Sequence, residues 1–306
     1  MKRFIILIII VIISGCGKDK KPVKYDPRFP DQGMINGIEY YSGKSIENVS
    51  DEDLLKFKEI LHGKTIYSIK GIELCKNLEH LELQRTEISD ISYIKDLTKL
   101  RHLNIWKTNI TDLTPIENLV NLEELSLRQT KITNLYSVKR LKKLKSLHYY
   151  DNSKKCLVDD FTPLSGLENI EVIEIRIDNI KKLPDFSKMK KLKILSLQIN
   201  KNLDAQIISE ALNIEELILY GKVLLLPNDF SKMTKLKKVT IGSSTTMNAS
   251  SVATGFSIET IVLKGKFKEL EWLENMPNLK EVSNLTDDDT PNDVFNRLQM
   301  KGVNVK

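Results

Sequence analysis

Apolar positions along the chain repeat at intervals of 22 residues, except for one interval of 26 and a last one of 21. Most segments follow the frame L-x-x-L-x-L-x-x-T/N-x-I-x-x-I/L-x-x-I/L-x-x-L, and they begin at Asn77, Lys99, Asn121, Lys143, Asn169, Lys191, Asn213, Lys235, Ser257 and Asn278. The L-x-L part alternates apolar and polar residues, which predicts a short strand with one buried face. The apolar residues that follow at spacings of about three predict a 3-10 or irregular turn.

One segment of this kind cannot bury its own apolar face, so neighbouring segments stack around a shared core. The frame is that of leucine-rich repeats. The stretch "LELQRTEISDISYIKDLTKL", which begins at Leu81, and the next two segments resemble the 22-residue repeats of bacterial internalins. The resemblance covers residues 65–282 and implies an α/β solenoid of about ten coils, with a parallel concave sheet and a 3-10 or irregular convex side.

The resemblance also marks a polar position that follows each strand, where the family often has an Asn that bonds along the inner turn. This chain has there Thr86, Thr108, Thr130, Asn152, Asp178 and Asn200. The last three segments depart from the pattern with Lys222, Ser244 and Lys266, so we expect the C-terminal third of the array to be less regular.

Amphipathic segments at both ends predict helical caps, which a solenoid needs to cover its terminal coils. Residues 50–64 predict a helix with Ser50 as N-cap, Gly63 at its end, and one apolar face made by Leu54, Phe57 and Leu61. Residues 283–306 predict a second cap, with a helix that buries Val294 and Leu298 and ends before Gly302. The prolines and charges of residues 16–49 predict an extended tether.

Residues 1–15 predict a signal peptide, because Lys2 and Arg3 precede an apolar run from Phe4 to Ile13. At ~1.5 Å per residue this run reaches about half of a ~30 Å hydrocarbon core, too short for a membrane span. The ending Ile13-Ser14-Gly15-Cys16 resembles a bacterial lipobox, which implies cleavage before Cys16 and lipid on that residue. The alternative is an ordinary secretory signal with an incidental cysteine. Gly17 favours the outer membrane or cell surface over the inner membrane.

Composition and charge indicate a water-soluble folded protein and argue against nucleic acid as its partner. The chain is 41% hydrophobic and 29% charged, which is typical of a water-soluble folded protein. Its 47 basic side chains exceed the 41 acidic ones by a small margin, so nucleic acid is not expected as a partner. Cys75 aligns with a core leucine and Cys156 lies in the longer segment, so we expect no disulfide between them.

Side chains between and after the strand leucines point out from the concave sheet by the period-two rule. The position after L-x-L places Trp106 at the surface, flanked by Arg128 and within two strands of Tyr150. Because Trp, Tyr and Arg dominate binding hot spots, we interpret this surface as a site for a protein partner, made of Trp106, Arg128, His148, Tyr150, Arg176 and Tyr220. The alternative is that these neighbours only shield one another.

A second column of concave positions contains His80, His102, Glu124 and Ser146. Imidazole and carboxylate are zinc ligands, but parallel in-register side chains rarely converge on one point, so we expect no metal and no cofactor. Catalytic motifs such as G-x-S-x-G and H-E-x-x-H are absent from the sequence, and we do not expect an enzyme.

These patterns favour one function over two others. We expect a monomeric, lipid-anchored protein of the bacterial cell envelope that binds a protein through its concave face. The resemblance to internalins implies adhesion to a host protein. One alternative is a periplasmic or envelope scaffold that binds a partner from the same cell, and another is a structural module without a specific ligand.

Overall fold

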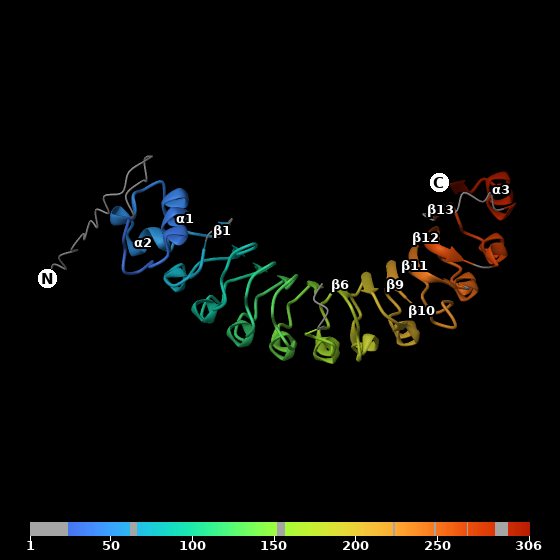
Figure 1. Cartoon of the computed structure of the whole chain (residues 1–306), viewed down its shortest axis with the longest axis horizontal. Helices are drawn as coiled ribbons and strands as arrows, with labels where there is room; N and C mark the ends of the chain where they lie inside the picture. The colour runs from blue at the N-terminus through green and yellow to red at the C-terminus, as the bar shows by residue number, and fades with distance from the viewer. Residues whose placement is uncertain are drawn as a thin grey trace.

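The chain forms a curved solenoid with strands on its inner face and 3-10 helices on its outer face (Figure 1). A computed structural model describes residues 24–61, 66–151, 157–222, 224–247, 249–267, 269–284 and 293–306. Among these residues, 12 strands build one sheet in which neighbouring strands run parallel. The predicted fold class, a leucine-rich repeat solenoid with a parallel concave sheet, is confirmed.

The strands of this sheet follow the chain order. They are β1 (Glu59–Leu61), β2 (His80–Glu82), β3 (His102–Asn104), β4 (Glu124–Ser126), β5 (Ser146–Tyr150), β6 (Val172–Ile177), β7 (Ile194–Ile199), β9 (Glu216–Gly221), β11 (Lys238–Met247), β12 (Thr260–Phe267), β13 (Glu281–Asn284) and β14 (Asn304–Val305). A separate pair of short strands is formed by β8 (Leu203–Asp204) and β10 (Leu224–Leu225).

The helices are short except near the two ends of the chain. The 3-10 helices are η1 (Ile46–Asn48), η2 (Ile72–Leu74), η3 (Ser92–Ile94), η4 (Thr114–Ile116), η5 (Tyr136–Arg140), η6 (Thr162–Gly166), η7 (Phe186–Lys188), η8 (Gln206–Glu210), η9 (Ser250–Thr254) and η10 (Leu270–Asn275). The α-helices are α1 (Gln32–Ser42), α2 (Asp51–Leu54) and α3 (Asp293–Met300). None of the helices in the described ranges is long and apolar enough to span a bilayer.

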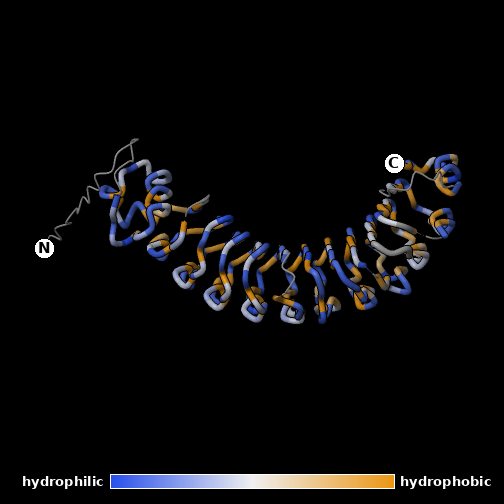
Figure 2. Tube along the Cα trace, viewed as in Figure 1, coloured by the Kyte–Doolittle hydropathy of each residue, from blue (hydrophilic) through white to orange (hydrophobic). Residues whose placement is uncertain are grey.

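The core is a continuous stack of apolar side chains between the sheet and the outer helices. Hydrophobic and hydrophilic residues alternate around each coil (Figure 2). One residue from each of ten strands is fully buried at the same repeat position, namely Leu81, Leu103, Leu125, Leu147, Ile173, Leu195, Leu217, Val239, Ile261 and Val282. Cys75 is also buried in this core, as predicted, and burial raises the pKa of its thiol to about 12.

Buried threonines follow the first strands of the array. The Thr86 hydroxyl donates to the Leu83 carbonyl at 2.7 Å, and Thr108 repeats this bond to Ile105 at 2.8 Å. Strands β2 and β3 are 3 residues long, whereas β11 and β12 run for 10 and 8 residues. At the repeat position of Thr86 and Thr108, those two coils have Ser244 and Lys266. Strands β11 and β12 are therefore the part of the C-terminal third that departs most from the short strands of the first coils.

The prediction of a tether through residue 49 was wrong for residues 24–49, which fold as part of the N-terminal cap. Helix α1 begins after its N-cap Asp31, ends at Gly43 with a φ of 65°, and buries Met34, Ile35 and Ile38. Asp31 also ties this helix to the first coil. Its Oδ1 accepts the N–H groups of Gly33 and Met34 at 2.8 and 3.1 Å, and its Oδ2 accepts those of Tyr67 and Ser68 at 2.8 and 3.1 Å.

The helix expected over residues 50–64 is much shorter in the structure. Ser50 and Asp53 form a capping box, but α2 ends at Leu54, and the chain then enters β1 at Glu59. Leu54 and Phe57 are nevertheless buried. At the other end of the array, α3 buries Val294 and Leu298 and is followed by Gly302 with a φ of 85°.

Three predictions lie outside the described residues. They are the signal peptide at residues 1–15, the lipidation of Cys16, and the placement of Cys156 in a loop.

We expect Asp31→Ala to destabilise the fold by about 3 kcal/mol, because it removes the cap of α1 and two charge-assisted bonds to the first coil. Urea unfolding followed by circular dichroism measures this difference. Asp96→Ala is the matched control, since Asp96 is an exposed carboxylate of the next coil. Equal stability of the two variants would show that Asp31 does not join the cap to the array.

Candidate partner-binding site

The residues predicted to bind a partner lie on the concave sheet at one repeat position. Tyr150 is in register with Arg176, Arg176 with Gln198, and Gln198 with Tyr220. Trp106 and Arg128 occupy the same position just beyond β3 and β4, where backbone bonds continue the ladder. We call the set Trp106, Arg128, Tyr150, Arg176, Gln198, Tyr220, Gly242 and Lys264 the aromatic column.

Trp106 is half-buried because two neighbours cover its ring system. The Arg85 guanidinium lies 4.5 Å from the ring centroid, and the indole N–H donates to Gln129 Oε1 at 3.1 Å. Arg128 is the in-register neighbour of Trp106, but the cation stacked on the ring comes from the preceding coil. These contacts hold one face of Trp106 at the surface in a defined orientation.

The two tyrosines of the column are also covered by cations. The Arg176 guanidinium lies 5.0 Å from the centre of the Tyr150 ring, and Lys264 Nζ lies 5.2 Å from that of Tyr220. Gly242 is next to Tyr220 in register, and a Cβ atom there would come within 2.2 Å of Tyr220 Cδ1. The Tyr220 ring thus lies over the glycine backbone, a position that any larger residue would block.

Arg128 and His148 belong to a polar network beside the column. Arg128 reaches across β5 to Glu174 Oε2 at 2.8 Å, and the same oxygen lies 2.7 Å from His148 Nδ1. His148 Nε2 contacts the Ser146 hydroxyl at 2.8 Å. Hydrogen bonding from His148, followed by the charges of His148 and Arg128, lowers the pKa of Glu174. His148 therefore lies at the predicted site, where it contacts Arg128 and Glu174 and is not stacked on an aromatic ring of the column.

The second column of concave positions, which contains His80, His102, Glu124 and Ser146, does not form a shared set of metal ligands. His102 Nε2 lies 2.6 Å from Glu82 Oε1, and its Nδ1 lies 2.9 Å from Glu124 Oε2, so each ring nitrogen has a separate carboxylate partner. The His80 ring is tilted against the His102 ring at 5.8 Å between centroids. Across the ranges that the structure describes, no three His, Cys, Asp or Glu side chains are grouped to hold a metal ion.

A row of alternating charges runs along the edge of the sheet where the strands begin. We call it the charged ladder, and it consists of Lys58, Glu79, Arg101, Glu123, Lys145, Glu171, Lys193, Glu215, Lys237, Glu259 and Lys280. Glu123 is paired with both neighbours, Arg101 and Lys145. Further pairs join Lys58 to Glu79 at 2.7 Å and Lys193 to Glu171 at 2.7 Å. The charges of this edge therefore compensate one another.

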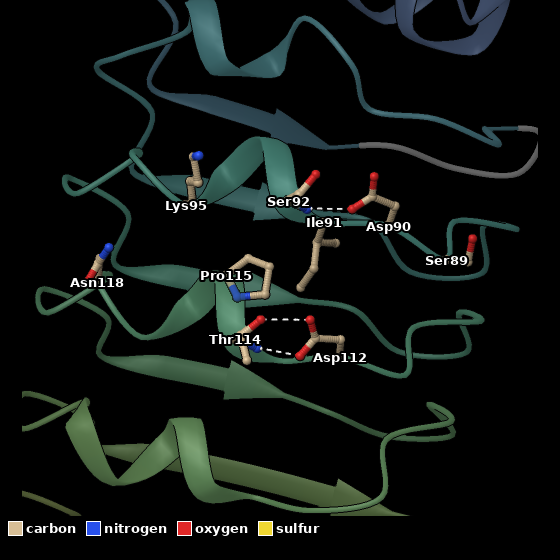
Figure 3. A pocket seen from close by; sticks show the side chains of 9 residues that line it. All are labelled: Ser89, Asp90, Ile91, Ser92, Lys95, Asp112, Thr114, Pro115 and Asn118. Carbon is tan, nitrogen blue, oxygen red and sulfur yellow. Dashed lines mark hydrogen bonds between the residues drawn. The ribbon is translucent and has the colours of Figure 1, made fainter.

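A shallow cavity of about 340 Å³ lies on the outer side, between η3 and η4 (Figure 3). Its two carboxylates bond within their own coils. Asp90 accepts the N–H of Ser92 at 2.7 Å, and Asp112 accepts the N–H and the hydroxyl of Thr114 at 2.8 and 2.7 Å. These bonds lower the pKa of Asp112 and begin the 3-10 helices. The carboxylates of this cavity thus serve the fold of the coils.

Sequence reasoning missed Arg85, which stacks on Trp106, and Glu174, which orients Arg128. The sequence did indicate where Arg85 lies. It follows Gln84, which holds the column position in the coil before that of Trp106, so the two residues are on neighbouring coils. Period-two alternation assigns a face to each residue, but the direction of a long side chain depends on its neighbours.

Comparisons with known proteins agree with the fold. The profile of the family described as "Leucine-rich repeat region" matches residues 62–295. An internalin (InlF) of Listeria monocytogenes is 24% identical over 91% of this chain and 82% of its own, with a TM-score of 0.76. Internalin C2 of the same organism is 21% identical over 84% of this chain and 94% of its own, with a TM-score of 0.51.

A plant protein shares the fold at lower identity. The ectodomain of the membrane receptor kinase GASSHO1/SCHENGEN3 from Arabidopsis thaliana, solved in complex with CASPARIAN STRIP INTEGRITY FACTOR 2, is 17% identical, with a TM-score of 0.55. The match covers 81% of this chain and 32% of the plant chain. No curated protein sequence matches the chain.

Glu123→Gln tests the charged ladder through its pH dependence. Hydrogen bonds from Lys145 and then Arg101 lower the pKa of Glu123. A carboxylate with a lowered pKa stabilises the fold above its ordinary pKa of about 4.3, and this contribution is lost as the pH falls through the lowered value. We expect the variant to lose roughly 0.5 kcal/mol at pH 7 and to approach the wild type as the pH falls through the lowered pKa of Glu123.

Urea unfolding at several pH values measures this difference. Glu168→Gln is the control, because Glu168 is an exposed glutamate outside the ladder, and it should change stability at none of these pH values. A Glu123→Gln effect that does not shrink as the pH is lowered through the acidic range would contradict an electrostatic origin.

Proposed function

The chain belongs to the leucine-rich repeat family, and from this premise we propose that it binds a protein partner through the aromatic column of its concave sheet. One observation carries the proposal: Trp106, Tyr150 and Tyr220 are each partly exposed and each held in place by a cation. Trp, Tyr and Arg are the side chains that most often dominate the energy of protein interfaces. We propose binding and not catalysis as the activity.

The covering cations favour binding because they reduce its entropic cost. Immobilising a free side chain at an interface costs about 0.5–1.5 kcal/mol. Arg85, Arg176 and Lys264 already restrict the three rings before a partner arrives, while leaving part of each ring open to contact. If the side chains of the column only shielded one another, the ring of Tyr220 would not need to lie over a glycine.

The structural neighbours support a binding function without defining the ligand. The Arabidopsis ectodomain carries the same kind of array and was solved in complex with a second named factor. Because the repeats resemble those of internalins, we propose adhesion to a host protein as the biological role. We further propose that the protein acts as a monomer at the bacterial cell envelope, held in the outer membrane or at the cell surface by lipid on Cys16.

We expect the triple variant Trp106→Ala, Tyr150→Ala, Tyr220→Ala to lose its partner while remaining folded. Each hot-spot aromatic contributes about 2 kcal/mol or more, so the combined loss of affinity should exceed a thousandfold. The measurement compares, by mass spectrometry, the proteins captured from host serum and from bacterial envelope extract by the wild type and the variant.

The matched control replaces three exposed aromatic residues outside the concave sheet, by Tyr40→Ala, Tyr136→Ala and Phe256→Ala. It should retain the captured proteins. The proposal fails if the concave variant retains them as well, with its circular dichroism spectrum unchanged.

Lipid anchoring gives a separate prediction. The mature protein should begin at Cys16 and carry the mass of attached acyl chains, and Cys16→Ser should move it from the membrane to the soluble fraction, because acyl chains supply ~0.8 kcal/mol per buried methylene. Mass spectrometry of the N-terminal peptide and fractionation of cells measure both effects. An unmodified Cys16 in the mature chain would end the lipid proposal.

Protease accessibility on intact cells then separates the two classes of partner. We expect digestion of the array while a periplasmic control protein stays intact, which would agree with an external ligand. Protection of both proteins would contradict host adhesion and point to a partner inside the envelope.

A further inference from the structure

A cavity of about 690 Å³ lies at the edge of the concave sheet where the strands end. The turns after β2, β3 and β4 supply its walls, including Arg85, Lys107, Gln129 and Lys131. Arg85 and Gln129 are also the two residues that contact the ring system of Trp106. The cavity is therefore continuous with the aromatic column, and we call it the cationic cavity.

Positive charge exceeds negative charge in the lining of the cationic cavity, which has Arg85, Lys107 and Lys131 against Glu87. Among the described residues, Arg85, Lys107 and Lys131 form no ion pair with any carboxylate. The one acidic residue of the lining, Glu87, accepts a hydrogen bond from Asn109 at 2.8 Å. Cations of the charged ladder, at the opposite edge of the same sheet, pair with glutamates instead. Three cations thus face one cavity without an ion-pair partner in the described part of the chain.

The backbone holds these turns in place. Arg85, Lys107 and Gln129 have positive φ angles of 61°, 55° and 53°, which residues other than glycine rarely adopt. Their N–H groups donate to the carbonyls of Trp106, Arg128 and Tyr150 in the next coil at 2.7, 2.8 and 2.5 Å. Such conformations persist where the surrounding structure over-determines them, and they are frequent at binding sites. The cations therefore project from turns whose backbone conformation is fixed by the neighbouring coil.

We propose that the cationic cavity receives an acidic side chain, Asp or Glu, of the protein that binds the aromatic column. This inference rests on the proposed function and adds the chemistry of the partner. A carboxylate would neutralise the cluster of positive charge and could accept hydrogen bonds from Arg85, Lys107 and Lys131. The residues next to it in the partner would meet the Arg85–Trp106 stack.

A protein segment fits the site better than a sulfated polysaccharide. A long polyanion requires a basic track that extends along many coils, and the charged ladder alternates in sign over its whole length. The cations that line the cavity come from three consecutive coils, beside a tryptophan. One or two carboxylates next to an apolar side chain match this pattern of charge and aromatic surface.

The test uses four probes on the mature protein. They are the fluorescent peptide Gly-Glu-Phe-Glu-Gly, blocked at both ends, the same peptide with Gln in place of Glu, a heparin dodecasaccharide, and inorganic phosphate. We expect the Glu peptide to bind, with an affinity that falls as salt rises. The affinity of the Gln peptide should be lower by about tenfold or more.

The charge-removing variant is Lys107→Gln with Lys131→Gln, which changes two exposed residues and should leave the circular dichroism spectrum unchanged. We expect it to bind the Glu peptide at least tenfold more weakly. Lys95→Gln with Lys139→Gln is the control, since it removes the same charge from two exposed lysines outside the cavity, and its affinity should stay within twofold of the wild type.

Three outcomes would overturn the proposal. The first is equal peptide binding by the cavity variant and the wild type. The second is tighter binding of the heparin fragment that depends on Lys107 and Lys131, which would assign the cavity to a polysaccharide. The third is displacement of the peptide by phosphate at a concentration equal to that of the peptide, which would assign it to small anions.

Capture of the native partner separates failure of this inference from failure of the proposed function. If the inference holds, the cavity variant captures the partner at least tenfold less efficiently. If that variant captures the partner normally while the triple aromatic variant does not, the acidic contact is refuted and the concave site stands. Normal capture by both variants would refute both proposals.

Discussion

The structure depends on the fact that no coil can bury its own apolar face. Each strand is too short to form a core alone, and β2 to β4 have only 3 residues apiece. Stability therefore comes from neighbours stacked in register, so that Leu81, Leu103 and Leu125 meet as direct partners. The same register that buries these residues sets the outward positions in columns, and the aromatic column follows from it.

Much of this organisation could be predicted from the amino-acid sequence. A period of 22 residues determines which positions share a column, so the surface placement of Trp106 and its alignment with Tyr150 and Tyr220 required no coordinates. The threonines after the strands were recognised as a shared position as well. Their hydrogen bonds were not predicted, because a hydroxyl that bonds to a carbonyl three residues earlier leaves no mark in the repeat pattern.

Features that lie outside the repeat were harder to predict. The prolines before Asp31 and the charges of the segment concealed the helical spacing of Met34, Ile35 and Ile38, although Asp31 and Gly43 mark the two ends of α1. The stacking of Arg85 on Trp106 was hidden for another reason. A column assigns each side chain to a face, but a long cation can reach forward or backward by one coil, and only the packed structure decides between them.

The alternating signs of the charged ladder constrain how such an array can change in length. Removing a single coil, for example the one that carries Glu123, would place Arg101 directly beside Lys145 and turn two attractions into a repulsion. Removing two consecutive coils would restore the alternation. The alternation of charge along this edge therefore favours a change in length by two coils at a time over a change by one.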